Sequence, residues 1–260
     1  MANSDGKLRV AAIGDLHVME NSVAPYRDLF AEIGNAADVL VLCGDLTNFG
    51  RTSEAEILAE DIRACSIPVV GVLGNHDYEC GQPEEVARIL HEAGMTVLDE
   101  QAVEIEGVGF AGVKGFCGGF GRGALGPWGE EAVKRFVNEA VQEALKLESA
   151  LARLRTAVRI VLLHYAPIAA TVAGEPPEIF PYLGSSRLEE PLGRLGVTAI
   201  FHGHAHRGTA EGRTAAGTPV YNVALPLLTR LFPEQPLKIL EVTVSPEEAE
   251  HLPLPQPTPR

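Results

Sequence analysis

The sequence predicts an α/β protein in which sheets are layered against helices. Short apolar runs rich in Val, Ile and Leu recur along the chain, and helix-type patterns lie between them. The runs end in Gly, Asp, Asn, His or Pro, which favours strands over buried helices. The expected strands cover residues 8–13, 38–43, 68–73, 108–113, 158–163, 197–202, 219–224 and 237–243.

Three helices have ends that the sequence marks. Ser53 and Glu56 have the spacing of a capping box and predict a helix start. Pro83 suits the first turn of the next helix, and Gly94 follows its last turn. Apolar residues at helical spacing over residues 129–155 predict a long amphipathic helix.

Two segments between these elements are expected to be loops. Residues 114–129 are dense in glycine, and residues 166–187 carry several prolines without a clear period. Residues 1–250 are expected to form one domain, and residues 251–260 form a proline-rich tail.

The composition restricts the classes of partner. The chain has 260 residues, and 35 acidic against 21 basic side chains give a formal charge of −14. This balance disfavours a nucleic-acid-binding surface, so an anionic substrate needs local positive charge, which metal ions can supply. Scattered cysteines and the lack of a signal peptide or membrane-spanning run predict a cytoplasmic protein without membrane contact. The oligomeric state stays open.

Metal-type ligands follow five of the apolar runs directly. Because the carboxyl ends of strands in an open α/β sheet lie along one edge, these groups are expected to converge. Two divalent ions require carboxylate oxygen and imidazole nitrogen with one bridging carboxylate, and such donors are present. In Asp-x-His and His-x-His pairs, side chains at i and i+2 of an extended segment point the same way. The groups are Asp15 with His17, Asp45, Asn75 with His76 and Asp77, His164, and His204 with His206.

The ordered series Asp-x-His, Gly-Asp, Gly-Asn-His-Asp, His and Gly-His-x-His resembles the calcineurin-like metallophosphoesterase superfamily. The resemblance spans residues 14–206. It implies a four-layer fold, a two-sheet β-sandwich flanked by helices, with the site at one edge. It also implies a hydrolase of phosphate esters, phosphodiester or phosphomonoester, that acts through a water activated by two metals. The substrate is expected to be a small molecule.

The same resemblance implies a role for each motif residue. Asp45 would bridge the two ions, which could be manganese, iron or zinc, and His76 would be the general acid. Asp77 is expected to support the site without binding metal. The first ion would be held by Asp15, His17 and His206, and the second by Asn75, His164 and His204.

The second block departs from that of the protein serine/threonine phosphatases. Phe49 stands where they have a phosphate-binding arginine, and Asn48 stands where they have an aspartate that orients the catalytic histidine. The pattern is nearer the small phosphodiesterase branch. The amide oxygen of Asn48 can still accept a hydrogen bond from His76, but it cannot stabilise an imidazolium as a carboxylate would.

Other readings of the sequence remain open. Residues 119–126 contain a Gly-x-Gly-x-x-Gly match, so a dinucleotide-dependent oxidoreductase is one alternative. A non-catalytic metal-binding scaffold is another. The favoured interpretation of residues 114–129 is a flexible flap, with Arg122 or Lys114 as a phosphate contact. The remaining histidines, His91, His202 and His251, are assigned to packing or solvent.

Overall fold

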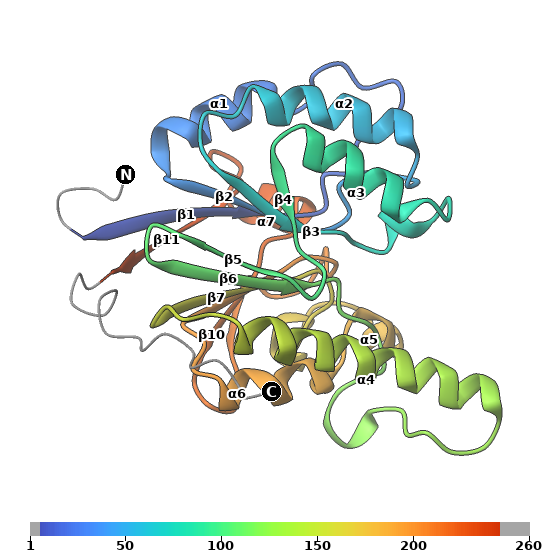
Figure 1. The fold of residues 1–260 in the computed structure, drawn as a ribbon. Coiled ribbons are helices and arrows are strands. Elements are labelled where there is room, and N and C mark those ends of the chain that lie inside the picture. Colours follow the sequence, from blue (N-terminus) through green and yellow to red (C-terminus); the bar gives the residue numbers. More distant parts are fainter. Residues whose placement is uncertain (1–5, 245–260) are drawn as a thin grey trace, which may run out of the picture.

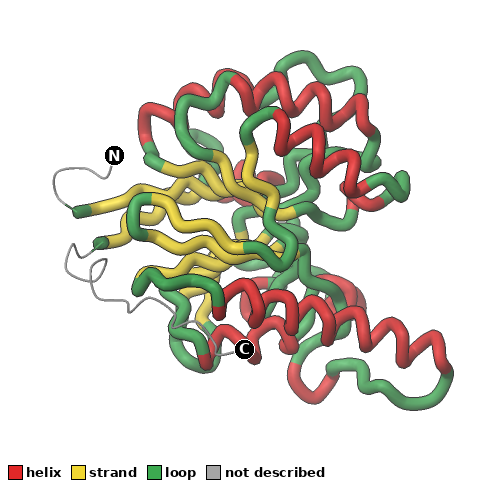
Figure 2. The backbone as a smooth tube through the Cα atoms, in the orientation of Figure 1, coloured by secondary structure: helices red, strands yellow, loops and turns green. Residues whose placement is uncertain are grey.

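The structure is a computed structural model, and it describes residues 6–244. Two sheets are packed face to face, with helices on both outer sides (Figures 1 and 2). The first sheet has the order β11 (Lys238–Thr243), β1 (Lys7–Ile13), β2 (Val39–Cys43), β3 (Val69–Val72) and β4 (Met95–Val97). The second has the order β5 (Ala102–Ile105), β6 (Val108–Val113), β7 (Val158–Leu163), β8 (Ala199–His202), β10 (Pro219–Asn222) and β9 (Glu211–Arg213).

The alternation of side chains along the strands separates the hydrophobic cores. In β1, Val10 and Ala12 face the second sheet, while Ala11 and Ile13 face the helices. The outer core of the first sheet includes Phe30 and other residues of α1 (Arg27–Ala36), α2 (Thr52–Arg63) and α3 (Pro83–Glu92).

The second sheet is covered in the same way. Val161 and Leu163 of β7 pack with Leu147 and Leu151 of α4 (Glu131–Ala152), and α6 (Glu189–Arg194) contributes to the same core. The order helix, sheet, sheet, helix confirms the four-layer sandwich that the resemblance implies.

The strand directions bring distant parts of the chain to one edge. β1, β2 and β3 are parallel, as are β6, β7, β8 and β10. Backbone hydrogen bonds join the segments just beyond these strands, with Asp15 N donating to Gly44 O, Gly14 N to Val223 O, and Gly203 N to His164 O. The carboxyl ends of both sheets therefore meet.

All eight predicted strands are present, and three further strands were not predicted. β4, β5 and β9 are short and lie at the edges of their sheets. An edge strand with one exposed side needs few apolar residues, as Glu211–Arg213 illustrates.

The predicted capping box of α2 is wrong. The helix begins at Thr52, and Glu54 accepts hydrogen bonds from the backbone N–H groups of Phe49 and Arg51. Ser53 instead donates to the Glu20 carboxylate. The predicted helices at residues 83–94 and 129–155 are present as α3 and α4. Four α-helices within residues 6–244 were not predicted, namely α1, α5 (Phe180–Leu183), α6 and α7 (Leu225–Leu231).

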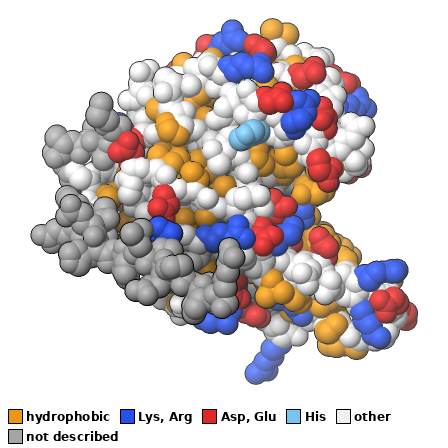
Figure 3. Space-filling model, viewed as in Figure 1, with side chains coloured by type: hydrophobic (Ala, Val, Ile, Leu, Met, Phe, Trp, Pro, Cys, Tyr) orange, Lys and Arg blue, Asp and Glu red, His pale blue; other side chains and the backbone are white. Residues whose placement is uncertain are grey.

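Several expectations concern the surface and the ends of the chain. Among residues 6–244, the helices are too short or too polar for any to cross a bilayer. On the face shown in Figure 3, acidic and basic side chains are interspersed over the described part of the surface. The tail at 251–260 and His251 lie outside the described residues, so the predicted domain boundary stays a prediction.

Candidate metal centre

The predicted ligands converge where the strands of both sheets end. Three sets of side chains each bring one ligand atom per residue within 4.8 Å of the others. Asp45 and His17 each belong to two sets. The sets are Asp15, His17 and His206; Asp45, His164 and His204; and His17, Asp45 and His76.

His17 has two buried ring nitrogens that find no hydrogen-bond partner within the described chain. Its Nε2 lies 3.8 Å from Asp45 Oδ2, and its ring centroid lies 5.4 Å from that of His206. His206 Nε2 lies 2.9 Å from Asp15 Oδ1. Buried polar atoms without partners are costly, and a cation held by these side chains would remove that cost.

His164 is oriented so that a lone pair faces other acceptors. Its Nδ1 lies 3.0 Å from the Cys43 carbonyl oxygen, which can only accept, so Nδ1 donates. In the neutral ring Nε2 then has no proton, yet it lies 2.9 Å from Asn75 Oδ1 and 3.3 Å from Asp45 Oδ1. Acceptors gathered in this way suit a cation.

His204 is oriented by a loop rather than by a strand. Its Nε2 donates to the Tyr182 carbonyl at 3.1 Å, which leaves Nδ1 free. The seven side chains thus offer imidazole nitrogen, carboxylate oxygen and one amide oxygen, a donor set that fits manganese, iron or zinc. Their individual roles as ligands stay predictions.

The backbone reaches this arrangement through strained conformations. Asp15, His17, Asp45 and His204 have φ values of 58°, 47°, 48° and 69°. Non-glycine residues rarely adopt this left-handed region, and such strain tends to gather at functional sites. The expected extended geometry of the i and i+2 pairs is therefore wrong, because a left-handed turn at the ligand directs the side chains inward.

Gly44 and Gly203, which precede predicted ligands in the sequence, leave space for predicted ligands from other segments. A Cβ at Gly203 would lie 2.2 Å from Asp15 Oδ2, and one at Gly44 would lie 2.6 Å from His164 Nδ1. Neither position tolerates a side chain without displacing a predicted ligand. The two glycines explain how these residues approach so closely.

His76 and Asp77 have different surroundings. His76 Nδ1 donates to the backbone carbonyl of Asn48 at 2.7 Å, so the contact with Asn48 uses the main chain and not the side-chain amide. The buried Asp77 carboxylate accepts hydrogen bonds from the backbone N–H groups of Leu46, Thr47 and Gly74. Asp77 thus supports the loops beneath the site, as the sequence predicted.

Burial dominates the electrostatics of the centre. Desolvation lowers the pKa of His17 to about 4 and the pKa of His204 to about 3. His206 differs, because its hydrogen bond to Asp15 raises its pKa. Desolvation raises the pKa of Asp45. Neutral imidazoles at His17 and His204 are the form that binds metal.

His202 is a packed histidine rather than a member of the site. It is fully buried, with Nε2 2.8 Å from Thr171 Oγ1 and Nδ1 2.8 Å from the Gly203 carbonyl. Desolvation lowers its pKa to about 4. His91, on α3, is exposed.

The metal-free protein should lose stability in acid. His17, His202 and His204 have folded-state pKa values below the ordinary value, so between pH 6.5 and about 4 the unfolded chain binds more protons. The contribution of these three groups to stability therefore rises with pH in this window, while the raised pKa values of His206 and Asp45 act in the opposite direction. We expect the free energy of unfolding to be lower by about 2 kcal/mol or more at pH 5 than at pH 7. Urea unfolding of chelator-treated protein measures this difference, and equal stability at both pH values would contradict it.

The two predicted loops are hydrogen-bonded to each other. Gly118 N donates to Pro181 O at 2.7 Å, Gly119 N to Gly184 O at 2.9 Å, and Ser186 N to Gly119 O at 3.2 Å. These bonds join part of the expected flap to the second loop, and the flexibility of residues 114–129 stays a prediction. The loop at 166–187 also contains the helical turn α5 (Phe180–Leu183), which supplies the carbonyl that orients His204.

The two candidate phosphate contacts in these loops have different surroundings. The Lys114 ammonium donates to the Gly115 carbonyl and lies over the rings of Tyr78, Phe116 and Tyr165 at 5.1–5.4 Å. Arg122 is exposed. The glycine match at residues 119–126 lacks its required context, because β6 ends at Val113 and α4 begins at Glu131.

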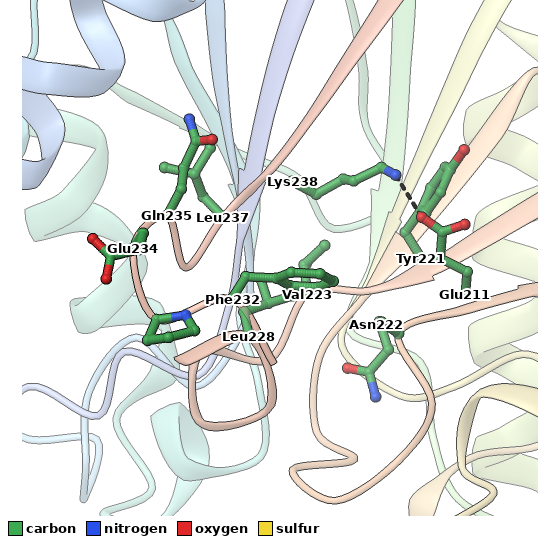
Figure 4. Close-up of a pocket in the computed structure, with 12 residues that line it drawn as sticks. Glu211, Tyr221, Asn222, Val223, Leu228, Phe232, Glu234, Gln235, Leu237 and Lys238 are labelled. Atoms are coloured by element: carbon green, nitrogen blue, oxygen red, sulfur yellow. Dashed lines mark hydrogen bonds and ion pairs between the residues drawn. The ribbon is translucent and has the colours of Figure 1, made fainter. Parts of the chain in front are cut away.

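A separate cavity of about 510 Å³ lies between the edges of the two sheets (Figure 4). It is lined by residues of β9, β10, β11 and α7. Lys238 of β11 bonds Glu211 of β9 at 2.6 Å, and its ammonium lies over the Tyr221 ring. No predicted metal ligand lines this cavity, so it is distinct from the candidate metal centre.

The chain matches a known protein family over most of its length. The model that describes the sequences of the calcineurin-like phosphoesterase family matches residues 8–208. The chain belongs to this family. It is a metallophosphoesterase, an enzyme that hydrolyses phosphate esters, and this family uses divalent metal ions. This assignment gives no support to the oxidoreductase or the non-catalytic scaffold.

Solved structures with low sequence identity share the fold. Phosphopantetheinyl hydrolase (PptH) from Mycobacterium tuberculosis has a TM-score of 0.62 at 15% identity, covering 94% of this chain and 98% of that one. The protein TT1561 of Thermus thermophilus has a TM-score of 0.51 at 15% identity, with coverages of 92% and 99%. A putative 5′-nucleotidase from Staphylococcus aureus has a TM-score of 0.50 at 15% identity, with coverages of 83% and 48%. No curated protein matches the chain.

Two tyrosines beside the metallophosphoesterase centre were not identified from the sequence. Tyr182 supplies the carbonyl that holds His204, and the Tyr165 ring centroid lies 4.6 Å from that of His204. Tyr165 directly follows His164, a position that could have drawn attention to it. Tyr182 lies in a loop without a motif, so no sequence signal marked it.

Proposed function

We propose that this metallophosphoesterase hydrolyses a small-molecule phosphomonoester or phosphodiester at a centre formed by seven side chains. The proposed ligands are Asp15, His17, Asp45, Asn75, His164, His204 and His206. The observation that carries the proposal is their convergence, with unpartnered His17 nitrogens and a His164 Nε2 that faces two oxygens.

Bound divalent cations would supply the positive charge that an acidic protein lacks, and they would acidify a nucleophilic water. Asp45 is proposed to contribute one carboxylate oxygen to each half of the centre. Its Oδ1 lies 3.3 Å from His164 Nε2, and its Oδ2 lies 3.8 Å from His17 Nε2. Its position is fixed by the His76 backbone N–H, which donates to Oδ1 at 2.8 Å.

His76 is proposed to protonate the leaving oxygen. The hydrogen bond from Nδ1 to the Asn48 carbonyl fixes the ring and leaves Nε2 to hold and release a proton. The His76 ring centroid lies 4.6 Å from that of His17, so the proton donor is beside the centre. A general acid at this place lowers the barrier for poor leaving groups most.

The proposal is tested by assaying purified protein loaded in turn with manganese, iron and zinc. The substrates are an aryl phosphomonoester, 4-nitrophenyl phosphate, and an aryl phosphodiester, bis(4-nitrophenyl) phosphate. We expect metal-dependent turnover of at least one substrate, with the preferred ester and ion identified by kcat/KM. Absence of turnover on both esters with all three ions would overturn the proposal.

A further inference from the structure

Tyr165 lies against the proposed metal ligands. It directly follows His164 at the end of β7, and its ring centroid lies 5.4 Å from that of His164 and 4.6 Å from that of His204. Only 7% of the residue is exposed. The ring therefore lies between the predicted ligands and the apolar core that the second sheet shares with α4.

The Tyr165 hydroxyl has no hydrogen-bond partner within residues 6–244. By contrast, the hydroxyl of Tyr26 donates to the Leu16 carbonyl. Within residues 6–244, the fully buried side-chain nitrogen and oxygen atoms without a partner belong to His17 and Asp61. The Tyr165 oxygen is not one of them, so this oxygen is in contact with solvent. A phenol is protonated at neutral pH, so this hydroxyl is a donor that is available to a ligand, on a ring that lies beside His204.

The backbone and the neighbouring rings hold Tyr165 in place. The Lys114 carbonyl accepts from the N–H groups of both His164 and Tyr165, at 3.0 and 3.1 Å. The Phe116 ring centroid lies 6.0 Å from the Tyr165 ring, and a Cβ at Gly115 would lie 3.3 Å from Tyr165 Cβ. A donor fixed before substrate arrives loses little entropy on binding it.

Two cationic side chains of the flanking loops are engaged elsewhere, and the aromatic residue of the second motif offers no donor. Phe49 is apolar, Arg51 is ion-paired with Glu20, and the Lys114 ammonium donates to the Gly115 carbonyl. A phosphoryl group at the centre would carry several acceptor oxygens, and a hydrogen bond to a charged oxygen is stronger than one to a neutral oxygen. The Tyr165 hydroxyl can meet this need.

We propose that Tyr165 is a substrate-contacting residue whose hydroxyl donates a hydrogen bond to a non-bridging phosphoryl oxygen of the bound ester. This assignment rests on the proposed function of the centre. It adds a protein donor to a site whose other side chains are proposed as metal ligands or as the proton donor.

The test is Tyr165→Phe, which removes the hydroxyl and keeps the ring. We expect kcat/KM for the preferred aryl phosphate to fall about tenfold to a hundredfold, the loss typical of a hydrogen bond to a charged group. The inhibition constant of orthophosphate, which offers the same oxygens, should rise by a similar factor. Metal content and melting temperature should match those of the wild type.

Tyr221→Phe is the matched control, because Tyr221 lies in the separate cavity of Figure 4. It should retain wild-type kinetics. Turnover by Tyr165→Phe within twofold of wild type, or an unchanged orthophosphate inhibition constant, would overturn this inference alone. An inactive wild-type protein would overturn the proposed function instead.

Discussion

Asp45→Asn should reduce kcat for aryl phosphates by at least about a thousandfold. The two Asp45 oxygens face different halves of the centre, toward His164 and toward His17. An asparagine amide keeps one oxygen but replaces the other with an NH₂ group, which cannot bind a cation. The measurements are phosphate release and metal content by mass spectrometry, and both should fall.

The control for this substitution is Asp99→Asn, because Asp99 is exposed and bonds Lys146 away from the centre. It removes the same charge from the chain and should leave turnover unchanged. If Asp45→Asn kept a tenth or more of the wild-type kcat, a bridging role for this carboxylate would be excluded.

His76→Ala should lower kcat by about a hundredfold to ten-thousandfold while metal content stays near normal. The loss should be larger for an alkyl phosphate than for a 4-nitrophenyl ester, because nitrophenolate leaves readily without a proton. Steady-state kinetics on both esters, with metal analysis of the same preparations, measure the effect.

The result for His76 also distinguishes two roles. His76 lies within reach of His17 and Asp45 as a third member of a metal-type set. A fall in metal content, with equal losses for both esters, would make it a ligand and would contradict the proton-donor role. His91→Ala is the control, since His91 is exposed on α3.

Much of the fold could be predicted from the chain alone. Strands buried on both faces, such as Val39–Cys43, need continuous apolar runs, and such runs are visible in the sequence. Edge strands such as Glu211–Arg213 carry no such run, because only their neighbours determine their position. The capping error at Ser53 arose because several acidic residues lie near the helix start, and Glu54 reaches the free N–H groups.

The candidate site was predictable in identity but not in geometry. Gly-Asp and Gly-His-x-His motifs identify Asp45 and His204, but the left-handed backbone at both residues depends on the packing around them. The carbonyl contacts of Asn48 with His76 and of Tyr182 with His204 involve backbone atoms, which every residue possesses. No residue type marks such a contact in a sequence.

The hydrogen bonding between the loops at residues 114–129 and 166–187 could not be predicted from the sequence either. The contacts of Gly118 and Gly119 with Pro181 and Gly184 join segments that lie far apart in the chain. Glycine density at residues 114–129 indicated irregular backbone, which is present, but it did not indicate which segment this backbone would contact. Backbone hydrogen bonds between loops form only once the sheets have brought the loops together.

The most direct test of the central claim is the dependence of turnover on bound metal. Chelator-treated protein should be inactive, and turnover should return as manganese, iron or zinc is added, reaching its maximum at two equivalents per chain. Full turnover by wild-type protein shown to contain no metal would contradict the account of the seven side chains as a two-cation centre.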